Sequence, residues 1–388
     1  MRFKTDDGDD FPVWNIKFGN EVFQNISDKN HNSDLPILAI TQDFGAIPRD
    51  LIDYKISVTD KSVESYKVVQ KGDFIISLRS FQGGIEYSDY QGICSPAYII
   101  LRPIITIDNI FYKYYLKTSK YITHLNRKLE GIRDGKMISY KYFSDIVLPI
   151  PSIVEQNKIS SFLSIIEARI QTQKKIITHI ESLMKELREK IFSQQFRFKD
   201  DLGNNFPKWQ SEKLGNIGTF FSGGTPLTSN KSYYKGNIPF IKSGEINSST
   251  TTQFISQEAL KKSSSKMVNK GDLIYALYGA TSGEVGLSKI DGAINQAILC
   301  VRTTLNNLFL LNYLKLKKEN ILKTYLQGGQ GNLSADIVKS LTIPIPSLQE
   351  QTKIADFLSS IEEKIEIEKK TLTQYETQKK YLLANLFV

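Results

Sequence analysis

The sequence predicts an α/β (α+β) fold. It consists of two tandem mixed α/β domains, each followed by a long helix, with the two helices paired as an antiparallel coiled coil of pseudo-two-fold symmetry. Three observations support this fold. Short motifs occur twice at one fixed spacing, a long segment without proline or glycine follows each set, and short β-type runs follow glycine turns in both interiors. The predicted divisions are 1–151, 152–196, 197–346 and 347–388.

The repeat is found by subtracting residue numbers. These pairs lie 195 positions apart: Arg2-Phe3-Lys4 and Arg197-Phe198-Lys199, Phe11-Pro12 and Phe206-Pro207, Trp14 and Trp209, Pro149-Ile150-Pro151-Ser152 and Pro344-Ile345-Pro346-Ser347, Glu155-Gln156 and Glu350-Gln351. Between these anchors the spacing drifts, to 199 positions at Lys71-Gly72-Asp73 and Lys270-Gly271-Asp272. Solenoid repeats are only a few tens of residues long. The chain is therefore a duplicated module with a fixed frame and a variable interior.

A long helix is predicted after each Pro-Ile-Pro-Ser motif. Ser152 and Ser347 each precede a glutamate by three residues, which fits a capping box, and no proline or glycine follows before Phe192 or Phe387. About forty helical residues span about 60 Å. Apolar residues follow a heptad pattern at these seam positions: Leu163, Ile166, Ile170, Gln173, Ile177, Ile180, Met184, Leu187 and Ile191, and Leu358, Ile361, Ile365, Glu368, Leu372, Tyr375, Lys379, Leu382 and Leu386.

The polar seam residues Gln173 and Glu368 occupy equivalent positions near the helix midpoints. If the helices pair antiparallel, we expect these two residues to meet in one polar layer that fixes the register. The alternative is that each helix packs only on its own domain.

The interiors of the two copies are predicted to be mixed α/β. Strands are expected at 73–78, 97–103, 272–277 and 297–303, and amphipathic helices with basic faces at 109–129 and 307–326. Loops rich in glycine and polar residues are expected at 39–50, 78–87, 129–143, 222–249, 278–286 and 327–336. Their side chains are of the types that hydrogen-bond base edges and phosphates, although such loops are common in proteins of every function.

Composition favours a binding protein over an enzyme. Lysine and arginine outnumber aspartate and glutamate by 50 to 41, a net charge of +9, which suits a polyanionic partner. There is no Walker A, methyltransferase or nuclease motif, and the nearest carboxylate pair, Asp43 and Asp53, has no counterpart in the second copy.

Cys94 and Cys300 form no CxxC motif, so no metal site is expected. With no signal peptide or bilayer-spanning run, a cytoplasmic protein is expected.

The repeated motifs resemble those of the specificity (S) subunits of bacterial type I restriction-modification enzymes. The resemblance rests on GGTP…YYKGNIPFIKSGEI (from Gly223) and GNLSADIVKSLTIPIPSLQEQTKIADFL (from Gly331) and covers the whole chain, although the first copy lacks GGTP. It implies that 1–151 and 197–346 are target recognition domains that each read half of an asymmetric bipartite DNA site. The helices 152–196 and 347–388 would act as the spacer between the half-sites.

The resemblance also implies partners. Two modification (methyltransferase) subunits would carry S-adenosylmethionine and methylate adenine, and restriction subunits using ATP and Mg²⁺ would join the full complex. The chain itself would hold no cofactor and have no catalytic residue. Two other functions compete with this interpretation: a coiled-coil adaptor that binds only protein, and half of a combined cutting and modifying enzyme. The basic charge disfavours the first, and the absence of a catalytic motif disfavours the second.

Candidate DNA-contacting residues lie in the predicted loops. One half-site would be contacted by Thr41, Gln42, Arg79, Gln82, Arg133 and Lys136, and the other by Thr225, Lys231, Tyr233, Lys242, Tyr278, Gln330 and Asn332. The equivalence of the two junctions also predicts that Met1 and Val388 lie close together. The DNA sequence that is read does not follow from the residues, since such loops obey no simple code.

Overall fold

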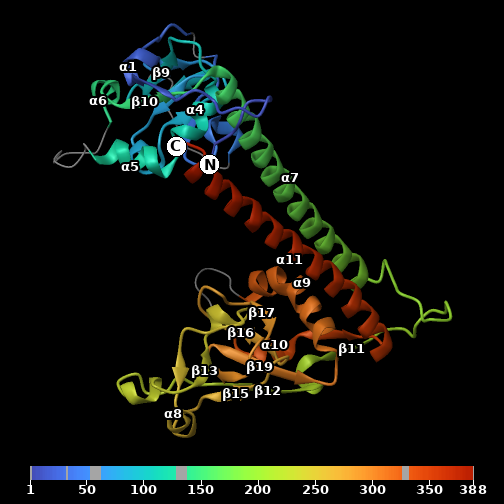
Figure 1. Cartoon of the computed structure of the whole chain (residues 1–388). Helices are drawn as coiled ribbons and strands as arrows, with labels where there is room; N and C mark the ends of the chain where they lie inside the picture. Colours follow the sequence, from blue (N-terminus) through green and yellow to red (C-terminus); the bar gives the residue numbers. More distant parts are fainter. Residues whose placement is uncertain (1, 32–33, 53–62, 128–137, 326–331, 388) are drawn as a thin grey trace. The chain divides into compact units, whose positions relative to one another are not determined.

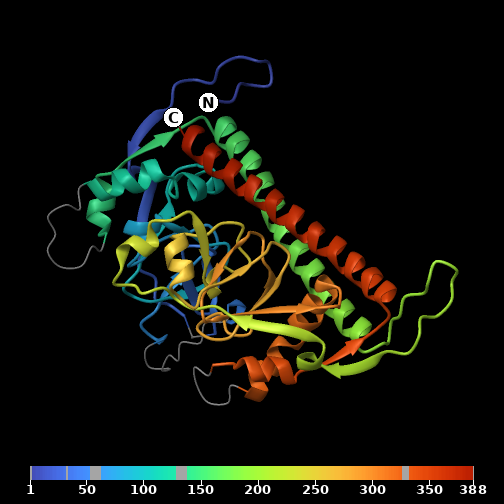
Figure 2. The same cartoon turned by 90° about the horizontal axis from the view of Figure 1, so that it is seen from below.

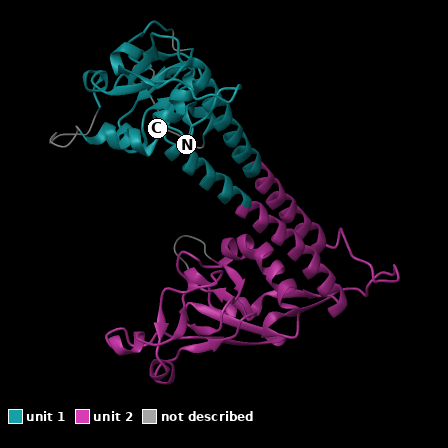
Figure 3. Ribbon diagram, viewed as in Figure 1, with its two compact units in different colours: residues 1–174, 371–388 teal, residues 175–370 magenta. Residues whose placement is uncertain are grey.

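A computed structural model describes residues 2–31, 34–52, 63–127, 138–325 and 332–387 (Figure 1). The chain divides into two compact units (Figure 3). Unit 1 combines residues 1–174 with 371–388, and unit 2 is the continuous segment 175–370. Each unit is a mixed α/β body, as predicted, and each contains part of both long helices.

Unit 1 is built on a four-stranded antiparallel sheet. Its order is β2 (Phe23–Ile26), β9 (Ile99–Pro103), β6 (Phe74–Ile76), β7 (Glu86–Tyr87). Three strand pairs flank it: β1 (Asn15–Phe18) with β10 (Val147–Ile150), β3 (Leu38–Thr41) with β4 (Gly45–Pro48), and β5 (Lys67–Val69) with β8 (Gly92–Cys94). The helices are α1 (Gly19–Val22), η1 (Arg49–Leu51), α3 (Ser80–Gly83), α4 (Asn109–Tyr115), α5 (Ser119–Arg127), α6 (Tyr140–Ser144) and the start of α7 (Ile153–Phe192).

Unit 2 repeats this plan and adds a second sheet. The first sheet has the order β12 (Gly218–Ser222), β19 (Ile298–Thr303), β16 (Leu273–Ala276), β17 (Val285–Leu287), and the second β14 (Phe254–Ile255), β13 (Ile238–Ile241), β18 (Gly292–Ile294), β15 (Lys266–Val268). β11 (Gln210–Lys213) pairs with β20 (Thr342–Ile345). The helices are η2 (Leu214–Asn216), η3 (Lys231–Tyr234), η4 (Ser243–Glu245), α8 (Gln257–Lys261), α9 (Asn307–Tyr325), α10 (Ala335–Ser340) and the start of α11 (Leu348–Asn385).

The predicted strands are confirmed as β6, β9, β16 and β19, and the predicted helix 307–326 as α9. The predicted helix 109–129 is instead two helices, α4 and α5. The Thr118 hydroxyl donates to the Tyr115 carbonyl at 2.8 Å and accepts from the Tyr121 amide at 3.2 Å. A threonine hydroxyl that satisfies both helix ends favours a new start over continuation.

Four of the predicted loops contain strand residues, namely 39–50, 78–87, 222–249 and 278–286. Segment 39–50 holds the hairpin β3–β4, whose tip runs from Thr41 to Gly45. Gly45 has φ of +70°, and a Cβ there would lie 2.6 Å from the Tyr87 carbonyl oxygen, so glycine is required. In unit 2, the predicted loop 222–249 contains the buried strand β13.

The two long helices are confirmed, with α7 of 40 residues and α11 of 38. They lie side by side in each unit (Figures 1 and 2). In unit 1, Glu167 pairs with Lys379 and Lys174 with Glu376; in unit 2, Glu181 pairs with Lys369 and Arg188 with Glu362. Within each unit the numbers rise along α7 as they fall along α11, so the pairing is antiparallel.

Both predicted seams are buried or half-buried at every position. Gln173 belongs to unit 1 and Glu368 to unit 2, so their meeting in one polar layer stays a prediction. Within unit 2, Glu368 also receives an ion pair from Lys364, one turn away on its own helix, at 2.5 Å.

A buried carboxylate joins the start of each long helix to the start of its domain. In unit 1 the fully buried Glu155 accepts from Arg2 Nε at 2.8 Å and from Trp14 Nε1 at 2.9 Å. In unit 2, Glu350 accepts from Arg197 Nη2 at 2.8 Å and from Trp209 Nε1 at 2.9 Å. One half of each predicted capping box is present, because the Glu155 and Glu350 amides donate to the Ser152 and Ser347 hydroxyls at 3.3 Å. The two carboxylates bind the arginine and tryptophan side chains instead.

An aromatic side chain at the end of each long helix closes the same pocket in each unit. Phe387 lies 5.2 Å from Phe111 and 5.7 Å from Tyr115, measured between ring centroids, in unit 1. Phe192 lies 5.4 Å from Phe309 and 5.3 Å from Tyr313 in unit 2. The two units therefore share one frame. The aromatic residue at the end of α11 packs in unit 1 as the one at the end of α7 packs in unit 2. Residues Met1 and Val388 themselves lie outside the described part.

Candidate nucleic-acid interface

Loops gather at one end of the main sheet in unit 1. Because β6, β7 and β9 are antiparallel neighbours, the end of β6 at Ile76 lies beside the starts of β7 and β9. Loop 77–85 and loop 95–98 therefore share this edge. The hairpin β3–β4 runs beside β7 through a parallel bridge between Ala46 and Ser88, so the hairpin tip, which precedes Ala46, lies toward the start of β7 at this edge.

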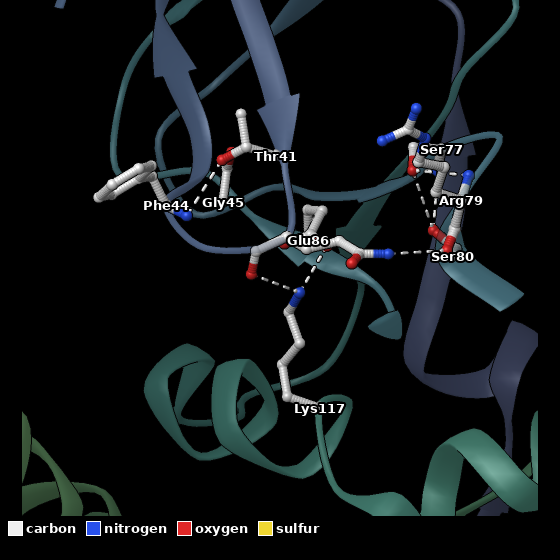
Figure 4. Close-up of polar contacts among 9 residues, drawn as sticks. Thr41, Phe44, Gly45, Ser77, Arg79, Ser80, Glu86 and Lys117 are labelled. Carbon is white, nitrogen blue, oxygen red and sulfur yellow. Dashed lines mark hydrogen bonds and ion pairs between the residues drawn. The ribbon is translucent and has the colours of Figure 1, made fainter. Parts of the chain in front are cut away.

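The described candidates of the first copy lie at this edge, and Figure 4 shows Thr41 and Arg79 of them. Thr41 ends β3, and its hydroxyl accepts from the Phe44 amide at 3.0 Å. Gln42 is exposed at the hairpin tip, and its Nε2 donates to the Arg79 carbonyl at 3.4 Å. Arg79 and Gln82 are exposed on the loop that contains α3. The structure thus brings four of the predicted residues into one cluster.

Serine hydroxyls hold the shape of loop 77–85. The amide of Ser77 donates to Ser80 Oγ at 2.9 Å, and the amide of Arg79 donates to Ser77 Oγ at 3.2 Å. Both serines are buried, whereas Arg79 is exposed. The two buried serine hydroxyls therefore hold the backbone that carries the exposed Arg79 guanidinium. A backbone held in place suits recognition by hydrogen bonds.

The corresponding edge of unit 2 collects loops in the same way. Leu277 donates its amide to the Ala297 carbonyl at 2.8 Å, and Leu333 donates to the Leu277 carbonyl at 2.8 Å. These bonds place Tyr278 and Asn332 beside loop 295–297. Thr225 joins them, since its hydroxyl donates to Gln296 Oε1 at 2.6 Å.

The other described candidates of the second copy divide between two places. Lys242 follows the end of β13, which runs parallel to β18 and ends at the same edge, so Lys242 lies on the side of loop 295–297. Lys231 and Tyr233 lie on η3, at the start of β13, and Tyr233 packs against the cluster of Ile238, Phe240 and Ile255. The cluster thus includes Lys242 but not these two. Arg133, Lys136 and Gln330 lie outside the described residues.

Three residues of these clusters were not among the sequence candidates. Gln296 is exposed and bonded to Thr225, and Lys117 and Glu86 form an ion pair beneath the hairpin tip of unit 1. Gln296 lies in a loop of only three residues between two buried strands. Lys117 and Glu86 are far apart in the chain, so only their spatial pairing reveals them.

The chemistry of both edges is that of binding. Exposed amide, hydroxyl and guanidinium groups match the donors and acceptors of base edges and phosphates. Burial raises the pKa of the Cys94 and Cys300 thiols to about 12, so neither is a ready nucleophile. Across the described ranges, no group of three His, Cys, Asp or Glu residues could hold a metal ion, and no helix is long and apolar enough to cross a membrane. The fold and its two loop-lined edges define a duplicated recognition protein.

Comparison with known proteins gives the family. The model of the type I restriction modification DNA specificity domain matches residues 4–182 and 207–377, so the chain belongs to this family. The type I restriction enzyme MjaVIII specificity subunit of Methanocaldococcus jannaschii is 23% identical over 350 residues, 84% of this chain and 80% of that protein. The Escherichia coli EcoR124I/EcoR124II specificity subunit is 25% identical over 166 residues, 40% of this chain and 41% of its own.

Solved structures share the fold. The crystal structure of a type I restriction-modification S subunit from M. genitalium matches with a TM-score of 0.59 over 100% of this chain and 99% of that chain, at 18% identity. A chain from a study of complex assembly and conformational transition in a type I R-M system matches with a TM-score of 0.60, over 97% and 98% of the two chains, at 17% identity. These structures show the fold, and the match of the family model makes the chain a specificity component, a role that is not itself catalytic.

Proposed function

We propose that this chain reads an asymmetric bipartite DNA site for a type I restriction-modification complex. Domain 1–151 reads one half-site and domain 197–346 reads the other. Helices α7 and α11 set the distance between the half-sites. The target is double-stranded DNA, and the consequence of recognition is adenine methylation or restriction by partner subunits.

The observation that carries this proposal is a fixed frame with divergent edges. The Glu155 and Glu350 nodes have matching partners at matching distances. The loops at the two sheet edges, by contrast, differ in sequence, length and hydrogen bonding. Two equivalent frames suit the two-fold symmetry of the duplex backbone, and unlike loops suit two unlike half-sites.

The partners follow from family membership and stay part of the proposal. Two equivalent frames offer equivalent docking positions to two modification subunits, which would hold S-adenosylmethionine. Restriction subunits that use ATP and Mg²⁺ would join the larger assembly. The thiols, histidines and carboxylates of this chain take no part in that chemistry.

The experiment that tests the proposal is a domain exchange. Residues 197–346 are replaced by the corresponding domain of another family member, and the chain is expressed with its modification partner. Methylome sequencing should show a motif in which one half has changed and the other half and the gap are retained. A motif altered in both halves would contradict the modular reading, and an unaltered motif would favour the protein-binding adaptor.

A further inference from the structure

Lys117 forms an ion pair with a buried carboxylate below the recognition edge of unit 1 (Figure 4). Its Nζ lies 2.5 Å from Glu86 Oε1, and the Glu86 side chain is only 2% exposed. The other carboxylate oxygen, Oε2, is buried without a hydrogen-bond partner among the described residues. A buried carboxylate depends on its partner, because removing that partner leaves an uncompensated charge or forces protonation.

Lys117 also joins this ion pair to both recognition segments. Its Nζ donates to the Gln42 carbonyl at 3.4 Å, and Gln42 Nε2 donates in turn to the Arg79 carbonyl at 3.4 Å. The Gln42 side chain lies so close to Gly83 that a Cβ there would fall 2.6 Å from Gln42 Cδ. One ammonium group therefore links the linker after α4, strand β7, the hairpin tip and loop 77–85.

Unit 2 makes a similar link from different positions. Lys318 of α9 pairs with Glu284, at the end of loop 277–284. The N-cap residues Asp108 and Asn306 are equivalent, because each donates its amide to the glutamine at the start of a long helix at 2.9 Å. Counted from these caps, the counterpart of Lys117 is Lys315, which pairs with Glu362 instead.

The carboxylates are likewise not equivalent. Glu86 pairs across the sheet with Ile75, and the matching position of β17 is Gly286, opposite Ile274. A lysine from the segment after β9 in unit 1, and after β19 in unit 2, thus meets a glutamate beside the recognition loop, although neither partner keeps its position. Such a link, made twice in interiors that have diverged, indicates a shared need to tie the loop to the frame.

We infer that Lys117 and Glu86 are positioning residues for sequence discrimination at the half-site read by unit 1. Their ion pair fixes the hairpin tip and loop 77–85 in one relative arrangement, in which Thr41, Gln42 and Arg79 face the same edge. In unit 2, Lys318 and Glu284 tie the end of loop 277–284 to α9. This inference rests on the proposed function.

The test uses the full chain assembled with its modification partner. Lys117→Met keeps most of the side-chain volume but removes the ammonium, and methylation is measured on a panel of DNA sites with single-base changes in either half-site. We expect discrimination in the half-site of unit 1 to fall about tenfold, the size of one weakened base contact, with the other half-site unchanged. Lys318→Met should give the mirror result.

Conservative variants separate positioning from folding. Glu86→Gln still accepts from Lys117, and Lys117→Arg still donates, so both should retain most of the discrimination. Equal loss in both half-sites, or unchanged discrimination in Lys117→Met, would overturn the inference. The domain exchange distinguishes the two failures: if exchange alters one half-site while Lys117→Met alters none, the proposed function stands and the positioning role is wrong.

Discussion

Glu86 makes the stability of unit 1 fall as the pH rises. Burial raises the pKa of Glu86 from 4.5 to about 6, against the opposing effect of the neighbouring Lys117 ammonium, and Asp43 adds to the increase. The side chain is buried in β7, within the main sheet. Glu86→Gln preserves the shape and an acceptor for Lys117 but abolishes the titration.

The sign and size of the effect follow from linkage. Well below pH 4.5 the carboxyl is protonated in the folded and the unfolded chain, so it does not alter the free energy of unfolding. As the pH rises toward the folded pKa, the unfolded chain loses its proton first, which stabilises the unfolded state. At about 1.4 kcal/mol per pKa unit, the wild-type unit loses up to about 2 kcal/mol relative to Glu86→Gln between about pH 4.5 and pH 7.

The assay is urea unfolding of both proteins across that pH range. A short deuterium pulse and mass spectrometry of a peptide covering 74–87 report on unit 1 separately. Glu284→Gln is the control in unit 2, because the Glu284 side chain is 41% exposed and solvent screens its charge. The difference between wild type and Glu86→Gln should grow with pH. A difference that is constant over the range would refute the reasoning.

Four further changes probe the shared frame. Phe387→Ala should destabilise unit 1 by about 3 kcal/mol because a buried ring is lost, and Phe192→Ala, whose ring is half-buried, should destabilise unit 2 by less; hydrogen exchange that reports the wrong unit would contradict this. Trp14→Phe removes one donor to the buried Glu155 and should cost about 1–3 kcal/mol in thermal or urea unfolding, whereas an unchanged midpoint would argue against the node. Inserting about one turn, roughly four residues, into α7 should change the gap in the methylated motif but not its halves, and an unchanged gap would contradict the spacer role.

The long helices could be predicted because their signal is local and periodic. Every heptad position of both seams is buried or half-buried. The apolar pattern alone does not fix their register, since the seam is apolar in several alignments. Within unit 1 the alignment is seen from ion pairs such as Lys174 with Glu376, two exposed residues outside the seam.

The interiors were harder to predict because long-range contacts decide them. The break at Thr118 depends on one hydroxyl, and the hairpin at 38–48 depends on how Gly45 packs under Tyr87. The candidates Thr41, Gln42, Arg79 and Gln82 share an edge, as loop composition suggested. Lys231 and Tyr233 come from a loop of similar composition but lie beside the start of β13. Composition does not show at which end of a strand a loop lies.

The node at Glu155 shows that a constant offset between repeated residues also predicts contacts. Arg2, Trp14 and Glu155 recur at an identical offset, and the three meet at one buried carboxylate in each unit. A constant offset between distant anchors is what a shared contact requires. Equal spacing therefore predicted the duplication, and it could also have predicted which residues touch.

The composition of unit 1 from two separate segments has a consequence for synthesis on the ribosome. Unit 2 is continuous, whereas unit 1 needs residues 371–387, which are made after all of unit 2. Chains begin to fold from their N-terminal parts as they emerge, yet the pocket formed by Phe111 and Tyr115 stays open until Phe387 arrives. The unit begun first is thus completed last. Premature termination between residues 174 and 371 leaves the first recognition edge on a unit that lacks its second segment.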